Sequence, residues 1–506
     1  MTFGAVSIVL GASGSVAPHT AWAEAAQPSW QQCRQDPQYP PDLPEQVLCA
    51  GLAVPVDWAH PAGPATELRL AKLPAADSAR RVGSLFFVGS SGVRSVFLAG
   101  SYLSPDLLDR FDIYSFDTRG SADPHRDIPP GAVVCESSAW EAANGLRFPA
   151  SAARYGDLRE ANKALAGNCR ALTGPLADHV DTASSARDLD AVRAAIGESA
   201  ITYFGTGDGT LLGQQYAELF PDRLAGMALD STMDHAQDVW SYHTSLARSL
   251  EATFAKFAQW CARTEACALH GEGVPGYLDD LRAKAEAGDL TGPDGPVSVE
   301  DLLTPVTAFT GDTTLWPLLA DTLRAFGAPA RAATGATAAG EPPVRGGDTA
   351  TTCQDFDFDL HGYGRFAALD RKLAAVAPHT RFNTDARYYL AQCQNWPSGA
   401  TNPPHRSNAS PRLPRILVAN SKYDVARPYE WALSLSRQLP SATLLTYDGV
   451  SVGTYFDSSC ARQAIDAYLL TGRTPPKGTH CPAVGPQPAT GAARALREPQ
   501  AVTAGW

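Results

Sequence analysis

The feature that most constrains this chain is a short glycine-rich turn between an apolar strand and a helix. Residues 200–204 (AITYF) predict a buried strand, and residues 211–219 (LLGQQYAEL) predict a helix. The turn between them, residues 205–209, has the sequence Gly-Thr-Gly-Asp-Gly. A strand that passes through a tight glycine turn into a helix is typical of proteins in which helices cover a parallel sheet. We therefore expect an α/β fold around this turn.

Apolar segments on both sides of the turn continue the alternation. We expect further strands at 46–57, 67–73, 83–88, 111–116, 224–229, 415–419 and 443–447, and helices at 182–196 and 458–470. This order predicts a mostly parallel central sheet with helices on both faces. Residues 236–400 are mainly helical instead, which indicates a lid inserted between sheet strands. Within the lid, the segment 327–347 is rich in Ala, Gly and Pro and predicts a loop.

These segments divide the chain into a core, a lid and two ends. We expect the core at 26–235 and 406–483, the helical lid at 236–405 and a tail at 484–506. Residues 1–25 predict a signal peptide, because an apolar stretch leads to the A-x-A-like site Ala21-Trp22-Ala23. No Lys or Arg precedes Arg34, so the basic start of such a peptide is missing. A disordered Ala-rich N-terminus is the alternative.

The cysteines also favour export. There are 10, spread along the chain with no C-x-x-C pair, which favours disulfides over zinc or thioredoxin chemistry. We therefore expect a secreted, extracellular protein. The sequence alone does not fix the connectivity, and our hypothesis is that neighbours pair. The pairs would be Cys33 with Cys49, Cys135 with Cys169, Cys261 with Cys267, Cys353 with Cys393, and Cys460 with Cys481.

Composition excludes several classes of function. A hydrophobic share of 44% with 19% charged residues indicates a globular chain. The net charge of −12 and the absence of a basic cluster argue against nucleic-acid binding. No stretch has the ~18 uncharged apolar residues of a membrane span. No His pair has helical ligand spacing, so we expect no metal.

Two kinds of site fit a glycine turn that follows a strand. One is the nucleophile elbow G-x-S-x-G, in which two glycines let strand and helix approach closely around a nucleophile. The other is the dinucleotide fingerprint G-x-G-x-x-G with a later acidic residue, here Asp230. In residues 205–209 the third glycine comes one residue too early for the fingerprint, and the turn lies far along the chain. Our interpretation is the elbow, and we expect no cofactor.

The elbow segment also carries a family resemblance. Residues 181–230 resemble the elbow region of secreted actinobacterial tripeptidyl-aminopeptidase-like hydrolases of the α/β-hydrolase fold. The segments 48–58 and 111–120 are similar to that family as well, as are Cys353 to Pro397 and Asp424 to Cys481. The resemblance covers about residues 30–483 in the same order. It implies the α/β-hydrolase fold and supports the pairing of neighbouring cysteines.

The resemblance implies that the family's catalytic triad is degenerate here. In Ser hydrolases a His takes the proton of the nucleophilic Ser, and a carboxylate orients the His. The Ser position falls on Gly207, the acid position on Asp424, and the His position on Val452 within Gly449-Val450-Ser451-Val452-Gly453. Loss of nucleophile or base costs on the order of 10⁶ in kcat. We therefore expect no hydrolysis by the triad mechanism.

Other residues near these positions are candidates for function. The family's oxyanion loop falls on Ser90, Ser91 and Gly92, which keep little of its Gly- and Pro-rich run. Asp208 beside the elbow and His235 after the next strand are candidates for general acid–base catalysis. The structural alternatives are that Asp208 caps the following helix and that His235 is a packing residue. For Asp424 the alternative is a turn-forming residue.

Three functions remain open at this stage. The first is a non-hydrolytic enzyme, of a cyclase or isomerase kind, that acts on a small organic or peptide-like substrate in a lidded apolar pocket. A place in secondary metabolism is suggested by analogy alone. The second is a non-catalytic pseudoenzyme that binds a ligand or peptide. The third is a residual peptidase or esterase with a rebuilt site.

Overall fold

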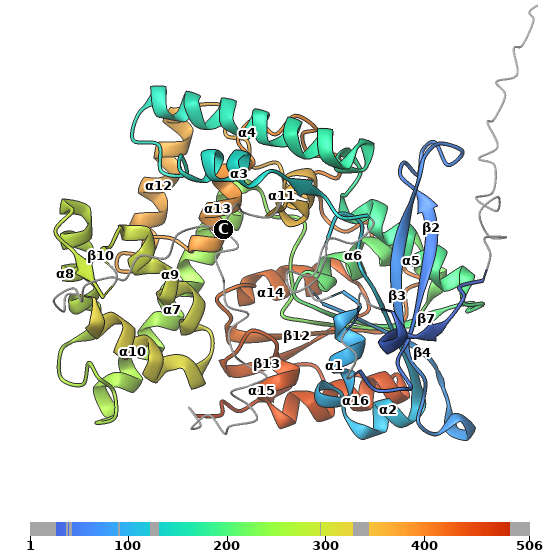
Figure 1. The fold of residues 1–506 in the computed structure, drawn as a ribbon. Helices are drawn as coiled ribbons and strands as arrows, with labels where there is room; N and C mark the ends of the chain where they lie inside the picture. The colour runs from blue at the N-terminus through green and yellow to red at the C-terminus, as the bar shows by residue number, and fades with distance from the viewer. Residues whose placement is uncertain are drawn as a thin grey trace, which may run out of the picture.

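A ten-stranded sheet forms the centre of the described chain (Figure 1). This computed structural model describes residues 27–485, apart from 37–38, 40–42, 90–91, 122–130, 294 and 327–343. The strand order is β1-β2-β3-β5-β4-β7-β8-β12-β13-β14. The strands are β1 (Gln31–Gln32), β2 (Leu48–Pro55), β3 (Ala65–Leu73), β4 (Gly83–Val88), β5 (Phe111–Phe116), β7 (Ile201–Thr206), β8 (Leu224–Asp230), β12 (Ile416–Tyr423), β13 (Ala442–Val450) and β14 (His480–Cys481).

The sheet is antiparallel at one edge and parallel elsewhere. Strands β1, β2, β3 and β5 pair antiparallel, whereas every pair from β5 through β4 to β14 is parallel. All strands predicted from the sequence are present, with ends shifted by a few residues. The mostly parallel sheet is therefore confirmed, and the carboxyl ends of β4, β7, β8, β12 and β13 meet at one edge. Ligand sites of such sheets lie at that edge.

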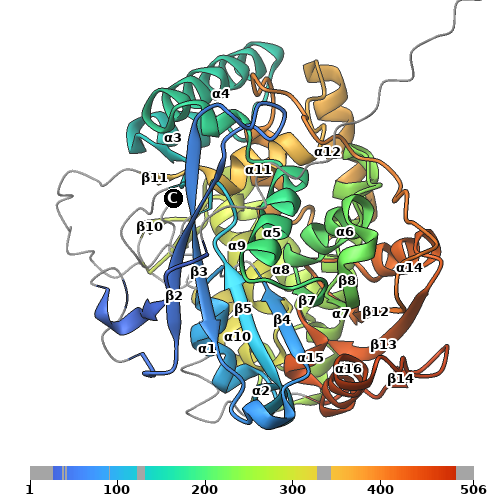
Figure 2. The same cartoon turned by 90° about the vertical axis from the view of Figure 1, so that its right-hand side faces the viewer.

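Helices cover both faces of the sheet (Figure 2). Helices α5 (Thr182–Ala195), α6 (Gly209–Leu219) and α14 (Tyr429–Gln438) share one buried apolar cluster with the sheet. On the other face, α1 (Arg94–Tyr102), α2 (Pro105–Arg110) and α16 (Ser459–Thr471) share a second cluster with the opposite sides of the strands. Side chains alternate between the faces of a strand, so both faces need apolar cover.

The segment between β8 and β12 forms helices beside the sheet, as expected (Figure 1). Among the described residues, none of the helices combines the length and the apolar character needed to cross a bilayer. The helices of this insertion are α7 (Val239–Arg263), α8 (Val274–Ala287), α9 (Val299–Thr310), α10 (Trp316–Ala325), α11 (Gly347–Asp355), α12 (Tyr363–Val376) and α13 (Thr384–Gln392). The expected loop at 327–347 lies largely outside the described residues.

A second group of helices joins this insertion, and it was not foreseen from the sequence. Helices α3 (Ser137–Asn144) and α4 (Ala152–Thr173) follow β5 in the chain and pack against α12 and α13 (Figure 1). They share a buried cluster with α11 and α13. The smaller pairs are β6 (Val134–Cys135) with β11 (Val344–Arg345) and β9 (Thr291–Gly292) with β10 (Gly295–Pro296), and α15 (Thr454–Asp457) follows β13.

The cysteines pair as neighbours, which confirms the hypothesis from the sequence. The disulfides are Cys33–Cys49, Cys135–Cys169, Cys261–Cys267, Cys353–Cys393 and Cys460–Cys481. The bond between Cys353 and Cys393 joins α11 to α13, two helices that line the cavity described below. The expected signal peptide at 1–25 lies outside the described residues, and so does the tail beyond 485.

Candidate functional site

The glycine turn lies at the carboxyl edge of the sheet and has an unusual backbone. Strand β7 ends at Thr206, Gly207 follows with φ of +55°, and α6 begins at Gly209. The Gly207 amide donates to the carbonyl of Asp230 at 3.1 Å, so the turn is tied to the end of β8. A positive φ is costly for residues other than glycine and is often found at functional turns.

The two outer glycines are required by close packing. A Cβ on Gly205 would lie 2.7 Å from the carbonyl oxygen of Gly209. A Cβ on Gly209 would overlap the carbonyl oxygen of Val88 in β4. Strand β7, helix α6 and strand β4 therefore approach each other more closely than any side chain would permit. This is the packing expected of an elbow.

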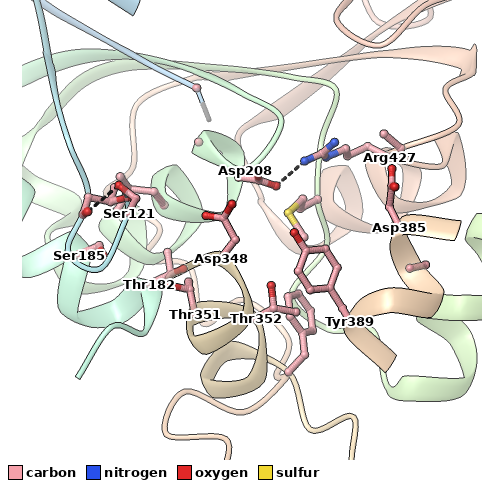
Figure 3. Close-up of a pocket in the computed structure, with 18 of the residues that line it drawn as sticks. Ser121, Thr182, Ser185, Asp208, Asp348, Thr351, Thr352, Asp385, Tyr389 and Arg427 are labelled. Atoms are coloured by element: carbon pink, nitrogen blue, oxygen red, sulfur yellow. Dashed lines mark hydrogen bonds and ion pairs between the residues drawn. The ribbon is translucent and has the colours of Figure 1, made fainter. Parts of the chain in front are cut away.

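The space above Gly207 is occupied by an arginine. A Cβ on Gly207 would lie 3.4 Å from Nη2 of Arg427, with no other side chain nearer. Arg427 follows β12, and its Nη2 also donates to the Asp208 carboxylate in an ion pair (Figure 3). Asp208 makes no side-chain capping hydrogen bond to α6, so the alternative that its side chain caps this helix is wrong. Its side chain instead holds Arg427 over the turn.

A cavity of about 310 Å³ lies in front of this ion pair. Its walls come from the loops after β4 and β5, from α5 and α6, and from the inserted helices α7, α11 and α13. The cavity is not mainly apolar, contrary to expectation, because carboxylates and hydroxyls line much of it. The charged residues in its described lining are Asp208, Asp348, Asp385 and Arg427.

Two of these carboxylates have no partner. Asp348 on α11 and Asp385 on α13 make no ion pair or side-chain hydrogen bond with the described residues, and both face the cavity. Both residues are exposed, so water reaches their carboxylates. The surrounding protein and the Asp208 carboxylate raise the pKa of Asp348 to about 6. The surrounding protein also raises the pKa of Asp385, against the opposing effect of Arg427. In Figure 3, Asp348 points towards Asp208, and Asp385 lies beside Arg427. The sequence analysis did not single out Asp348 or Asp385, because no motif includes either residue.

Hydroxyl groups line the rest of the cavity. Tyr389 on α13 lies among all three carboxylates, and burial together with these carboxylates raises its pKa well above the ordinary value (Figure 3). Tyr242 on α7 is 8% exposed and Ser185 on α5 is 3% exposed, and both line the cavity. Neither side chain makes a hydrogen bond to the residues that the structure describes. Thr351 and Thr352 on α11 add further hydroxyls.

Asp424 is buried beneath this site. One of its carboxylate oxygens accepts from the Ser231 hydroxyl at 2.5 Å, and the other accepts from the amides of Ala426 and Arg427 at 2.9 and 2.8 Å. Burial raises its pKa to about 6. All these contacts shape the turn that leads Arg427 to the cavity, which agrees with the turn-forming alternative.

Val452 lies away from the cavity. It follows β13, keeps 42% of its surface exposed and is not among the described residues that line the cavity. A Cβ on Gly311, at the end of α9, would lie 3.2 Å from Cγ2 of Val452. The inserted helices therefore pack against the position where the resemblance placed a His. The Asp230 carboxylate fixes the next residues by accepting from Thr454 and Tyr455.

His235 is held in a structural network behind the cavity. Its Nδ1 lies 3.0 Å from Nε2 of Gln215, and its Nε2 lies 2.9 and 3.1 Å from the carbonyl oxygens of Asp355 and Asn402. Burial lowers its pKa. Two carbonyls on one nitrogen make Nε2 the donor and leave Nδ1 to accept from Gln215. Both ring nitrogens are thus engaged, and His235 is not part of the described lining of the cavity.

The predicted oxyanion loop is only partly described. Ser90 and Ser91 lie outside the described residues. Gly92 lines the cavity with φ of +51°, and a Cβ there would overlap the Asp117 carboxylate. Among the described residues, no three His, Cys, Asp or Glu side chains are grouped so that they could hold a metal ion.

Comparisons with known proteins agree with this architecture. A family profile described as "alpha/beta hydrolase fold" matches residues 87–295, and one described as "TAP-like protein" matches residues 378–481. The chain is 28% identical to "Serine protease Hip1" of Mycobacterium tuberculosis over 501 residues, which cover 89% of this chain and 90% of that protein. It is 27% identical to "Tripeptidyl aminopeptidase" of Streptomyces lividans, with 91% and 87% covered. It is 29% identical to "Carboxylesterase B" of Mycobacterium tuberculosis, with 90% of each chain covered.

Proposed function

Because this chain belongs to the α/β-hydrolase fold family, we propose that it uses the family's cavity without the family's hydrolytic step. The protein binds a small ligand non-covalently and transforms it by positioning and proton transfer, as a cyclase or isomerase does. The observation that carries this proposal is the Arg427 guanidinium above Gly207. At the apex of the turn there is no side chain to attack a substrate, and a cation paired with Asp208 fills the space where one would project.

The described lining of the cavity also lacks a base of the usual kind. No His is among these residues. Without nucleophile and base, a Ser hydrolase retains only ~10³–10⁴ of its rate enhancement over water. The peptidase and esterase activities in the relatives' names therefore do not extend to this chain in our proposal.

Asp348 is the residue best suited to proton transfer. Its carboxylate is exposed to the cavity without a partner among the described residues, and the surrounding protein raises its pKa to about 6, close to neutral pH. A general acid or base works best when its pKa lies near the working pH. Tyr389 and Tyr242 can donate hydrogen bonds to a substrate oxygen beside it. The alternative function is that of a non-catalytic protein that binds the same ligand and does not transform it.

We further propose that the protein works outside the cytoplasm. Its five disulfides join all ten cysteines, and bonds of this kind persist in oxidising compartments.

Labelling of the purified protein with a fluorophosphonate probe tests the absence of a serine nucleophile. We expect no labelling and no turnover of p-nitrophenyl esters or peptide anilides, with Hip1 serine protease as the positive control. Covalent labelling of any residue in the cavity would refute the proposal. If the chemistry depends on Asp348, Asp348→Asn will abolish turnover of the eventual substrate and keep its binding. Unchanged turnover would remove Asp348 from the mechanism.

A further inference from the structure

One buried carboxyl group joins two walls of the cavity. Asp355 is the last residue of α11 and is 1% exposed. Its Oδ1 accepts from the backbone amide of Thr182 at 2.9 Å and from Nδ2 of Asn402 at 2.8 Å. Its Oδ2 makes a short hydrogen bond with the Thr182 hydroxyl. Since Thr182 is the first residue of α5, the end of an inserted helix meets the start of a core helix here.

The place of this carboxyl group is explained by α5 and not by its own helix. Acidic side chains are unfavourable at the C-terminal end of a helix and favourable at the N-terminal end, where amides lack partners within the helix. Asp181, the N-cap of α5, accepts from the amide of Ser184. Asp355 accepts from the amide of Thr182 between them. The start of α5 is therefore capped twice, once by its own segment and once by the insertion.

Residues beside Asp355 fasten α11 to the same part of the core. The buried Gln354 side chain accepts from the amide of Val180 at 2.9 Å and donates to the carbonyl of Ala177 at 2.8 Å. The Thr351 hydroxyl donates to the carbonyl of Val180 at 3.0 Å. We call this contact between α11 and residues 177–182 the α11 seam. It fixes the C-terminal half of α11, and the cavity-lining residues of that helix are fixed with it.

We propose that Asp355 is a positioning residue for the cavity, because its contact with the start of α5 sets the α11 wall against the α5 wall. The residues that line the cavity from these helices are Asp348, Thr351 and Thr352 on α11, and Thr182 and Ser185 on α5. Asp355 is not in the described lining and acts through them. This inference rests on the proposed function, because it concerns how the same cavity presents Asp348.

Hydrogen exchange of the full, oxidised protein, read by mass spectrometry, tests the contact. Asp355→Ala leaves the Thr182 amide and Nδ2 of Asn402 without their acceptor. It should speed exchange at least tenfold at pH 5 in peptides from 347–356 and 182–190, and leave α16 unchanged. Asp355→Asn should match the wild type at pH 5, because its amide oxygen accepts the same two N–H groups and its amide nitrogen donates to the Thr182 hydroxyl. The matched control is Asp357→Ala, since Asp357 is exposed just beyond α11. Wild-type exchange in Asp355→Ala, or equal loosening of α16, would overturn the proposal.

The pH profile of the wild-type protein gives a second test, which holds even if Asp355→Ala does not fold. Burial raises the pKa of Asp355 to about 7, and Asp181 is the charged group that faces it from α5. On its other side are His235, whose Nε2 lies 2.9 Å from the Asp355 carbonyl, and His405, which contacts the His235 ring and pairs with Glu218. Opening of the α11 seam would return the carboxyl to water, where its pKa is about 3.9, so opening becomes easier as pH rises from 5 to 7. After correction for the intrinsic rate, exchange at 347–356 should rise at least tenfold over this range in the wild type and stay level in Asp355→Asn. No rise in the wild type, or an equal rise in Asp355→Asn, would overturn the proposal.

The effect on the cavity is measured at Asp348. We expect Asp355→Ala to change the rate at which a water-soluble carbodiimide and glycine ethyl ester modify Asp348 at pH 6 by at least threefold. The rate is taken relative to Asp280, an exposed carboxylate on α8 outside the described lining, and should not change in Asp357→Ala. An unchanged ratio in Asp355→Ala would overturn the positioning role. Failure of these tests without fluorophosphonate labelling removes the role of Asp355 alone, whereas labelling of the wild-type protein removes the proposed function.

Discussion

Nη2 of Arg427 lies 3.4 Å from the point where a Cβ on Gly207 would stand. The two residues are 220 positions apart in the chain, yet the β12–α14 loop brings the guanidinium to the apex of the β7–α6 turn. The turn keeps the backbone shape of a nucleophile elbow. The space in front of Gly207 is filled by Arg427, which is ion-paired with Asp208. In our proposal, the difference from a hydrolase is therefore more than one missing hydroxyl.

Our proposal predicts that placing a Ser at Gly207 and a His at Val452 will not give hydrolysis. In Gly207→Ser/Val452→His the new hydroxyl would meet Arg427, and the new imidazole would start from a position packed against Gly311. We expect p-nitrophenyl acetate turnover to stay at the level of the wild-type protein. A gain of tenfold or more over wild type would show that the frame of the site is intact and that our view of Arg427 is wrong.

The close approach of α6 to β4 predicts a sharp difference between two glycines. Gly209→Ala should destabilise the protein by about 1–3 kcal/mol or more, because its Cβ overlaps the Val88 carbonyl and backbone must move. Gly156→Ala in α4 is the control, since a Cβ there meets nothing within 4 Å. Alanine is the better helix former, so Gly156→Ala should be stabilising by about 0.4–1 kcal/mol. Melting temperatures of the two variants test this, and equal values would contradict it.

Buried carboxyls make the protein more stable at mildly acidic pH. Burial raises the pKa of Asp230 and Asp424 to about 6 and that of Asp355 to about 7. An unfolded Asp has a pKa of about 3.9, so between about pH 4 and 7 the folded state binds more protons and stability falls as pH rises. We expect a higher melting temperature at pH 5 than at pH 8. Carboxyls with lowered pKa, such as Asp112, lose their contribution only below about pH 4.

A variant separates this effect from a general charge effect. Asp355→Asn removes the carboxyl with the highest of these pKa values and should reduce the difference in melting temperature between pH 5 and pH 8. A melting temperature that rises from pH 5 to pH 8 in the wild-type protein would contradict the prediction.

Local sequence patterns were sufficient to predict most strands of the central sheet. The apolar runs at 83–88 and 111–116 became β4 and β5 without change of bounds, because a buried parallel strand has a continuous apolar run that ends at turn residues. The helices α3 and α4 were missed, since their many polar and Ala residues give a weak apolar periodicity, and their packing against α12 and α13 is tertiary.

The site was predictable only where it is local. Gly205, Gly207 and Gly209 form one turn, so the sequence marks the elbow directly. Asp348, Asp385 and Arg427 come from three separate elements, and each follows an ordinary local pattern. The one available signal was that Arg427 follows Asp424 by three residues, within a turn that the Asp424 carboxylate closes. Asp348, Asp385 and Arg427 line one cavity because their three elements pack together in the fold. No short sequence pattern encodes that packing.

The bond between Cys353 and Cys393 has a consequence for how the protein matures. Helices α11 and α13 each supply part of the cavity wall, and this bond ties the two parts together covalently. A freshly made, reduced chain would have the same wall residues without that tie. Preparations made in a reducing cytosol would therefore test the cavity in a chain whose wall is not held by this bond.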